Sequence, residues 1–249
     1  MKNNYDKIAR YYDRLSRLVF FKSQLNAQVH QLRYLPAKGR VLIVGGGTGW
    51  ILEEISRLVP EGLHLVYVEI SAKMMALSKE RSVAGNTIDY INLGIEDFST
   101  EQSFDVICTP FLFDNFGEES AIKVFHQLNA MLSEEGLWFH TDFILPEGMG
   151  TGEKEGGRKE KDQNESIAAQ RGHWWKTAFL TMMYQFFKIV GNVEASKLIN
   201  MSPYFRTAGY QLLEEKFYYK GFIQSLVLQK PTRQKPALQK AALQELVGP

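Results

Sequence analysis

Three glycines, each two positions after the one before, have the spacing in this chain best suited to holding a ligand. They are Gly45, Gly47 and Gly49. The apolar segment 41–44 before them is typical of a buried strand, and the segment 50–58 after them has the apolar periodicity of a helix. A strand that turns into a helix through glycines brings bare backbone close to a ligand and points unpaired N–H groups at it.

A carboxylate follows at the end of the next predicted strand. Segment 63–68 is apolar and Glu69 comes directly after it, about 20 residues past the glycines, where a ribose can be held through its hydroxyls. An ionised carboxylate accepts two hydrogen bonds from a vicinal diol, whereas it would repel a phosphate. The simpler alternative is a tight turn with an exposed glutamate, but the strand–loop–helix–strand context favours a cofactor that carries a ribose.

The glycine spacing distinguishes two classes of such cofactors. Dinucleotide sites use G-x-G-x-x-G, whereas the spacing here is G-x-G-x-G and Trp50 stands at the start of the helix. A pyrophosphate needs an open helix end, so the tighter glycine run and the Trp suit a smaller, uncharged to cationic ligand. The spacing favours S-adenosylmethionine over NAD.

Several segments match one enzyme family in order. They are 5–13, 41–49, Glu69, 95–98, 104–111 and 132–143. Over roughly residues 1–145 the chain resembles a class I S-adenosylmethionine-dependent methyltransferase, closest to the small-molecule type that includes ubiquinone and menaquinone methyltransferases. The resemblance implies that the chain is an enzyme that transfers a methyl group to a small acceptor.

The same resemblance implies which residues contact S-adenosylmethionine. They are Tyr12, Gly45, Gly46, Gly47, Gly49, Glu69, Ile70, Met74, Glu96, Asp97, Phe98, Thr109 and Pro110. Three positions depart from the family pattern: Ile43 replaces an acidic residue, Gly46 replaces a Cys or Ala, and segment 93–95 replaces Gly-Asp-Ala. These departures bear on cofactor affinity more than on the fold.

Two alternatives to methyl transfer stay open. Aminopropyltransferases also carry an apolar residue and a Gly-Gly-Gly run at the first motif, although they lack the Tyr-rich N-terminal signature. A non-catalytic protein that binds S-adenosylmethionine or a partner on the same fold is motivated by Ile43 and Gly94, which stand where cofactor contacts are usual.

Strand-like and helix-like segments alternate along the chain, which predicts an α/β fold. Strands are expected at about 41–44, 64–69, 88–92, 104–109 and 137–143, and helices near 49–59, 72–82 and 118–132. Such alternation predicts a Rossmann-like, doubly wound sheet with helices on both faces. Segments 211–219 and 222–228 are separated by a short turn and predict an antiparallel hairpin. By resemblance the sheet has seven strands, and the last lies antiparallel between the fifth and the sixth.

The expected domain comprises residues 1–230, with an N-terminal helical cap at 1–34 and an insertion at 146–205, and a C-terminal tail follows at 231–249. Segment 147–173 is rich in Gly, Lys and Glu, so it is expected to form a mobile loop. Segment 174–190 predicts an aromatic-rich helix with one narrow polar stripe. This helix could pack against the domain or form a homodimer; alternatively, the insertion could be a lid over an apolar or aromatic acceptor.

Methyl transfer from a sulfonium depends mostly on positioning, although a general base can assist. Candidate bases near the strand ends are Asp142, His140, Asp114 and His173. Each also has a structural explanation: Asp142 could bind backbone N–H groups, Asp114 could form a turn, and His140 could be a hydrogen-bonded core residue.

Composition excludes several other functions. The net charge is +1 with no long basic block, which argues against nucleic-acid binding. The single cysteine, Cys108, excludes intramolecular disulfides and a cysteine-rich zinc site, and no metal is expected. No signal peptide and no run of about 20 apolar residues is apparent, so a cytoplasmic location without a membrane span is expected.

Overall fold

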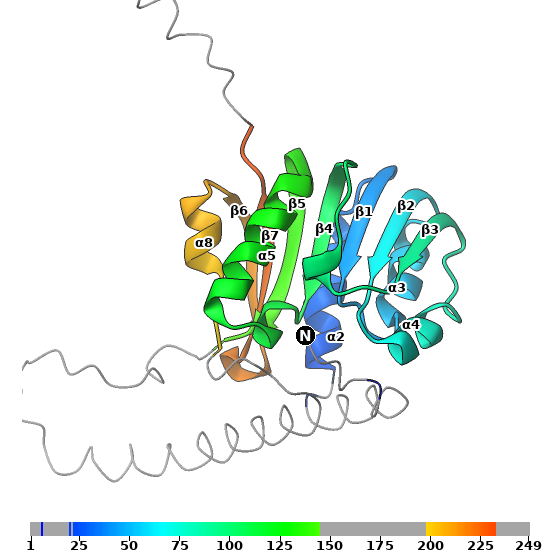
Figure 1. The fold of residues 1–249 in the computed structure, drawn as a ribbon, viewed down its shortest axis with the longest axis horizontal. Coiled ribbons are helices and arrows are strands. Elements are labelled where there is room, and N and C mark those ends of the chain that lie inside the picture. The colour runs from blue at the N-terminus through cyan, green and yellow to red at the C-terminus, as the bar shows by residue number, and fades with distance from the viewer. Residues whose placement is uncertain (1–5, 7–19, 21, 145–197, 233–249) are drawn as a thin grey trace, which may run out of the picture.

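The computed structural model describes residues 6, 20, 22–144 and 198–232, and a seven-stranded sheet is its centre. The strand order is β3-β2-β1-β4-β5-β7-β6 (Figure 1). The bounds are β1 Gly39–Val44, β2 Glu61–Val68, β3 Gly85–Ile91, β4 Phe104–Pro110, β5 Leu132–Phe143, β6 Gln211–Tyr218 and β7 Ile223–Gln229. Strands β1 to β5 pair in parallel, and β7 is antiparallel to both β5 and β6. The predicted doubly wound fold with its inserted last strand is therefore confirmed.

Helices cover both faces of the sheet (Figure 1). One face packs against α5 (Glu118–Met131) and α8 (Ser202–Thr207), and the other packs against η2 (His30–Tyr34) and α3 (Trp50–Leu58). Two further helices are α2 (Ser23–Val29) and α4 (Ala72–Ser78), and short 3-10 turns are η3 (Ile95–Asp97), η4 (Phe113–Asn115) and η5 (Tyr219–Gly221). Because strand side chains alternate, β1 supplies Leu42 and Val44 to one core and Val41 and Ile43 to the other.

Most predicted elements agree with the structure within a few residues, and two differ. Helix α4 ends at Ser78 rather than near residue 82; the Ser78 hydroxyl donates to the Met75 carbonyl, a local bond that competes with the helix ladder. Strand β5 begins at Leu132 rather than at about 137, and it contains Glu135 in a left-handed conformation (φ 64°).

The α2–η2 segment is the described part of the predicted helical cap, and it is fixed to the sheet by polar side chains. Gln31 donates from Nε2 to the carbonyls of His140 (2.8 Å) and Leu226 (3.0 Å) and accepts from the Thr141 hydroxyl. Ser225 donates to the carbonyl of Ala27. These bonds place α2 beside the carboxyl ends of the strands.

The end of the predicted insertion, residues 198–205, belongs to the core where it is described. Met201 and Phe205 are fully or almost fully buried, and the Phe205 ring contacts the rings of Phe125 and Trp138. The rest of that range, with the predicted helix 174–190 and His173, lies outside the described residues, so the lid and the homodimer stay predictions.

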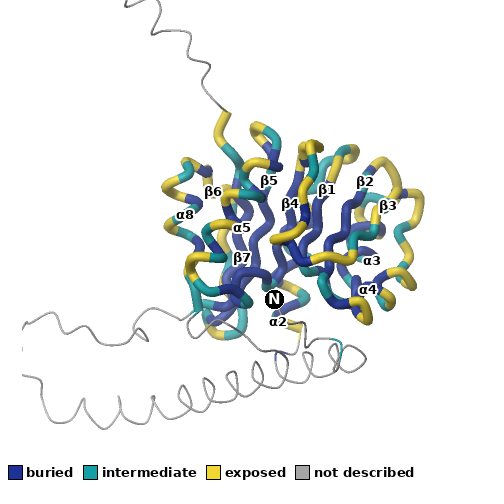
Figure 2. The backbone as a smooth tube through the Cα atoms, viewed as in Figure 1, coloured by how far each residue is buried: buried dark blue, intermediate teal, exposed yellow. Residues whose placement is uncertain are grey.

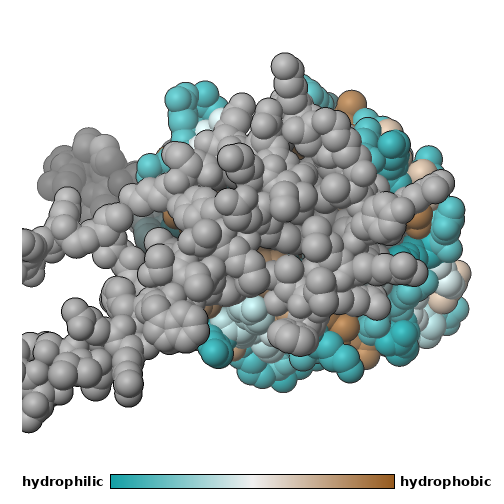
Figure 3. Space-filling view, turned by 90° about the horizontal axis from the view of Figure 1, so that it is seen from below, coloured by the Kyte–Doolittle hydropathy of each residue, from teal (hydrophilic) through white to brown (hydrophobic). Residues whose placement is uncertain are grey.

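Burial follows the expected layering (Figure 2). The inner strands are buried along most of their length, while the edge strands β3 and β6 alternate with exposed positions. The described surface visible in Figure 3 is mostly hydrophilic with small apolar patches. In the described part of the chain, no helix is long and apolar enough to cross a membrane, and no cluster of side chains could hold a metal ion.

Candidate cofactor pocket

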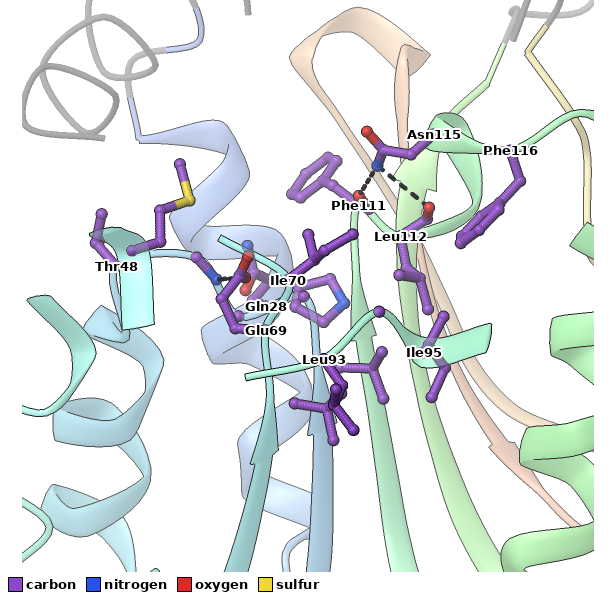
Figure 4. A pocket seen from close by; sticks show the side chains of 18 of the residues that line it. Gln28, Thr48, Glu69, Ile70, Leu93, Ile95, Phe111, Leu112, Asn115 and Phe116 are labelled. Carbon is purple, nitrogen blue, oxygen red and sulfur yellow. Dashed lines mark hydrogen bonds between the residues drawn. The ribbon is translucent and has the colours of Figure 1, made fainter. Parts of the chain in front are cut away.

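A pocket opens where β1, β2 and β4 end, at the edge of the sheet beside α2 (Figure 4). Five stretches line it: the glycine loop with Trp50, the end of β2 with Met74, the segment after β3, the loop after β4, and one face of α2. The lining residues are 44–48, Trp50, 68–70, Met74, 93–96, 110–112, Asn115, Phe116, Gln24, Leu25 and Gln28. This is the edge at which open α/β sheets bind ligands.

The glycine loop needs glycines for reasons that the structure makes specific. Gly45, Gly47 and Gly49 have φ between 63° and 77°, where a side chain is strained. Gly46 is required for a different reason, because a Cβ there would lie 2.5 Å from the ring of Tyr67. Tyr67 in turn donates from its hydroxyl to the carbonyl of Gly47 (2.9 Å). The buried Tyr67 therefore supports the loop from beneath.

Glu69 is 5% exposed and lines the pocket beside this loop. Its Oε2 accepts from the backbone N–H of Gly47 (3.0 Å), and its Oε1 accepts from that of Ser71 (2.8 Å). Burial raises the pKa of Glu69 to about 7, although these two hydrogen bonds favour the ionised form. A carboxylate oxygen accepts more than one hydrogen bond, so Glu69 keeps capacity for ligand hydroxyls.

The segment after β3 forms an apolar wall with one acid. Ile70, Leu93 and Ile95 line the pocket together with Glu96. Two predicted neighbours lie elsewhere: Phe98 is buried in the core on the α5 side, and Asp97 does not line this pocket. The predicted adenine segment thus contributes Glu96 to the pocket and leaves Asp97 and Phe98 outside it.

At the end of β4, too, one predicted residue lines the pocket and its neighbour does not. Pro110 lines the pocket, whereas Thr109 is fully buried and accepts a hydrogen bond from the Trp138 indole (2.9 Å). Phe111 follows with φ 52°, and its N–H donates to the carbonyl of Thr141 (2.7 Å). The left-handed backbone places Phe111 against the pocket and against the ring of Phe143, 4.8 Å away.

Of the thirteen predicted cofactor residues, eight line this pocket. They are Gly45, Gly46, Gly47, Glu69, Ile70, Met74, Glu96 and Pro110. Gly49 is the N-cap residue directly before α3 and packs against Ser78 rather than lining the pocket. Tyr12 lies outside the described residues.

The three described candidate bases are buried on the α5 side of the sheet and do not line the pocket. Asp142 accepts from the N–H groups of Phe113 and Phe143, both at 2.9 Å. Burial raises its pKa to about 7. Burial, with the nearby Asp142 charge, also raises the pKa of Asp114 well above its usual value. His140 contacts Thr109, and burial lowers its pKa to about 3.

The buried candidate bases stabilise the turn at the edge of the pocket and the core beside it. Asp142 fixes the η4 turn, and the residues around that turn reach the pocket from the β4 side: Phe111, Leu112, Asn115 and Phe116. The Asn115 amide donates to the carbonyl of Phe111 (2.9 Å). Neutral His140, packed between Phe113 and Phe205, is a core residue in this arrangement.

Several lining residues were not predicted as site residues. Gln24, Leu25 and Gln28 come from α2, and the spacing of the two glutamines by four in a predicted helix is the signal that could have identified one polar face. For Phe111 and its neighbours no local pattern indicates the left-handed turn.

Part of the chain is similar in sequence to known methyltransferases. Residues 41–136 match the family model of the methyltransferase domain. The ubiquinone/menaquinone biosynthesis C-methyltransferase UbiE of Geotalea daltonii is 31% identical over 123 residues, which are 47% of this chain and 52% of that protein. Residues 41–136 are therefore similar in sequence to the methyltransferase domain. The malonyl-(acyl-carrier protein) O-methyltransferase of Bacillus anthracis is 29% identical over 92 residues, 36% of this chain and 34% of that protein.

The chain thus spans about half or less of the curated relatives that it matches. Solved structures extend the likeness of the methyltransferase domain at the level of the fold. The 1,6-didemethyltoxoflavin-N1-methyltransferase of Burkholderia thailandensis is 12% identical with a TM-score of 0.54, covering 91% of this chain and 86% of that one. The complex of DhpI with S-adenosylhomocysteine is 14% identical with a TM-score of 0.55, covering 92% and 94%.

Proposed function

We propose that this protein is a methyltransferase that binds S-adenosylmethionine and transfers its methyl group to a small apolar or aromatic acceptor. The observation that carries the proposal is one pocket that combines the glycine loop, the buried Glu69 and apolar walls. The relatives named above, a C-methyltransferase and an O-methyltransferase by name, support the reaction class without fixing the acceptor atom.

The described residues suit this cofactor part by part. Glu69 would accept hydrogen bonds from the ribose hydroxyls, and Ile70, Leu93 and Ile95 would enclose the adenine, with Glu96 at its edge. The loop 45–48 would lie against the methionine part. Ile43 does not line the pocket but belongs to the core on the α3 side. Its side chain would therefore make no contact with the methionine part of the cofactor.

The wall of the pocket that would face the methyl acceptor, here called the acceptor wall, is apolar. Phe111, Leu112 and Phe116 face the pocket from the β4 side (Figure 4). Bound S-adenosylmethionine supplies the methyl group on a sulfonium, and the residues of this wall would exclude water and orient the acceptor for in-line attack. Glu69 and Glu96 are the titratable side chains among the described lining residues. The wall therefore favours an acceptor that needs orientation more than a general base.

A calorimetric titration tests the proposal. We expect S-adenosylmethionine and S-adenosylhomocysteine to bind and NAD to show no binding. Glu69→Ala should weaken binding of both by about tenfold or more, because a charge-assisted hydrogen-bond acceptor is lost. Glu61→Ala, at the exposed start of β2, is the control and should bind as the wild type does.

The other outcomes separate the alternatives. Preference for decarboxylated S-adenosylmethionine would instead support aminopropyl transfer. Tight cofactor binding without turnover on any phenol or quinone acceptor would support a non-catalytic binding protein. Unchanged affinity in Glu69→Ala would refute the ribose assignment.

A further inference from the structure

Gln28 brings an amide to the pocket from α2. The residue is 5% exposed and lines the pocket together with the glycine loop and Glu69 (Figure 4). Its Nε2 donates to the carbonyl of Gln24 (3.2 Å), and in the part of the chain that the structure describes its Oε1 accepts no hydrogen bond. Gln28 lines the pocket, so a ligand that displaces water from this amide oxygen must supply a donor in its place, because a desolvated oxygen without a donor is unfavourable.

The charges of the pocket indicate what kind of donor fits. Among the described lining residues the charged side chains are Glu69 and Glu96, and none is a lysine or an arginine. The two oxygens of Glu69 already accept backbone N–H groups. A pocket whose charged side chains are carboxylates suits a cationic donor.

The position of Gln28 selects one part of the proposed cofactor. If Glu69 holds the ribose and Leu93 with Ile95 encloses the adenine, the glycine loop and α2 are left for the methionine part. That part carries an ammonium group, whose N–H groups need acceptors once they leave water. Backbone N–H groups of the loop cannot serve, because they are donors.

We propose that Gln28 Oε1 accepts a hydrogen bond from the ammonium group of the cofactor and so selects ligands that keep the amino-acid end. This inference rests on the proposed function and adds a specificity-determining residue to its site. Gln28 acts here in binding, and it takes no part in the transfer of the methyl group.

Three thioether ligands test the inference by calorimetry. S-adenosylhomocysteine carries the amine and the carboxylate, S-adenosyl-3-thiopropylamine carries the amine alone, and 5′-methylthioadenosine carries neither. We expect Gln28→Met, a substitution of similar length, to weaken the first two by about tenfold or more, since a hydrogen bond to a charged group is lost. Binding of 5′-methylthioadenosine should change by less than twofold.

The control is Gln31→Met, which removes a buried glutamine that holds η2 to the sheet and does not line the pocket. It should lower thermal stability and leave the relative affinities of the three ligands unchanged. If Gln28→Met folds poorly, Gln28→Asn withdraws the amide by one methylene and should show the same selective loss.

The results distinguish the two levels of proposal. Equal weakening of all three ligands, or unchanged binding of the two amines, would overturn the role of Gln28 while leaving the methyltransferase proposal in place. A wild-type protein that binds none of them would overturn both.

Discussion

The carboxyl groups of Asp114 and Asp142 are both buried beside the loop that forms the acceptor wall. Burial raises the pKa of each, and the Asp142 charge adds to the effect on Asp114. In the folded protein these groups therefore hold protons at pH values where an unfolded chain has lost them. At the scale of single residues, the protonation of these two carboxyl groups is therefore linked to the free energy of unfolding.

The sign of the pH dependence follows from this linkage. A carboxyl group whose pKa is raised on folding stabilises the fold fully below its unfolded value of 3.8, and this stability is lost as the pH rises toward about 7. Because burial raises the pKa of Asp114 well above 3.8, we expect Asp114→Asn to reduce the fall in unfolding free energy above that pH by about 1.4 kcal/mol per pH unit, the equivalent of one proton. Urea unfolding between pH 4 and pH 8 measures the slope, with the exposed Glu101→Gln as control. Parallel curves for wild type and Asp114→Asn would contradict the linkage.

At the scale of elements, the glycine loop and β2 are shaped to each other. Gly46 leaves space that the ring of Tyr67 fills, and Tyr67 binds the Gly47 carbonyl from below. Where the resembled family has Cys or Ala, this chain has glycine together with a large aromatic residue on the neighbouring strand. The departure at Gly46 is thus explained by packing.

A double-mutant cycle measures this dependence. Gly46→Ala should destabilise the fold by about 1–3 kcal/mol, because the new methyl group overlaps a fully buried ring. Tyr67→Val removes the ring and destabilises the fold by itself, because a buried aromatic side chain is lost. Combined with Tyr67→Val, the Gly46→Ala substitution should cost less than it does alone, by an interaction energy of about 0.5–3 kcal/mol. Strict additivity in urea unfolding would show that the two residues do not compete for space.

Sequence patterns predicted these elements well where the signal is local. The run Val41–Val44 with its glycines identified β1, the loop and α3, and Glu69 was placed by the end of the next apolar run. It was harder to predict from the sequence which face of the sheet a single residue occupies. Thr109 and Pro110 are adjacent, so they point to opposite faces of β4, and Pro110 alone reaches the pocket.

The remaining site residues depend on contacts that are distant in sequence. Gln28 lines the pocket because η2, two residues further on, is bonded to β5 and β7, more than a hundred residues away. Phe111 reaches it through a left-handed backbone that Thr141 and Asn115 stabilise. Neither set of contacts leaves a periodic pattern in the sequence, so the places of Gln28 and Phe111 in the pocket could be found only from the structure.

At the scale of the whole molecule, the pocket joins segments from distant parts of the chain. α2, the glycine loop, the end of β2 and the loop after β4 all contribute walls. A ligand that contacts these segments together binds the folded state and has no site in the unfolded one. Binding should therefore stabilise the molecule as a unit.

Thermal unfolding with and without S-adenosylhomocysteine measures this effect. At a hundredfold excess over Kd, the unfolding free energy should rise by about 2.7 kcal/mol, which corresponds to an increase in Tm of roughly 5–10 °C for a domain of this size. NAD at the same concentration should leave Tm unchanged. A shift of equal size in Glu69→Ala would show that the ligand binds elsewhere.

The place of β7 in the sheet has a consequence for how the chain is synthesised. β7 (Ile223–Gln229) is the last strand of this sheet to be synthesised, yet it lies between β5 and β6, and its Leu226 carbonyl accepts a hydrogen bond from η2. A nascent chain that ends before Ile223 has β5 with one unpaired edge and the N-terminal helices without part of their anchor. Such an edge is a template for pairing with other chains. The domain can complete its sheet on the ribosome only after the hairpin has emerged, and β5 needs protection from aggregation until then.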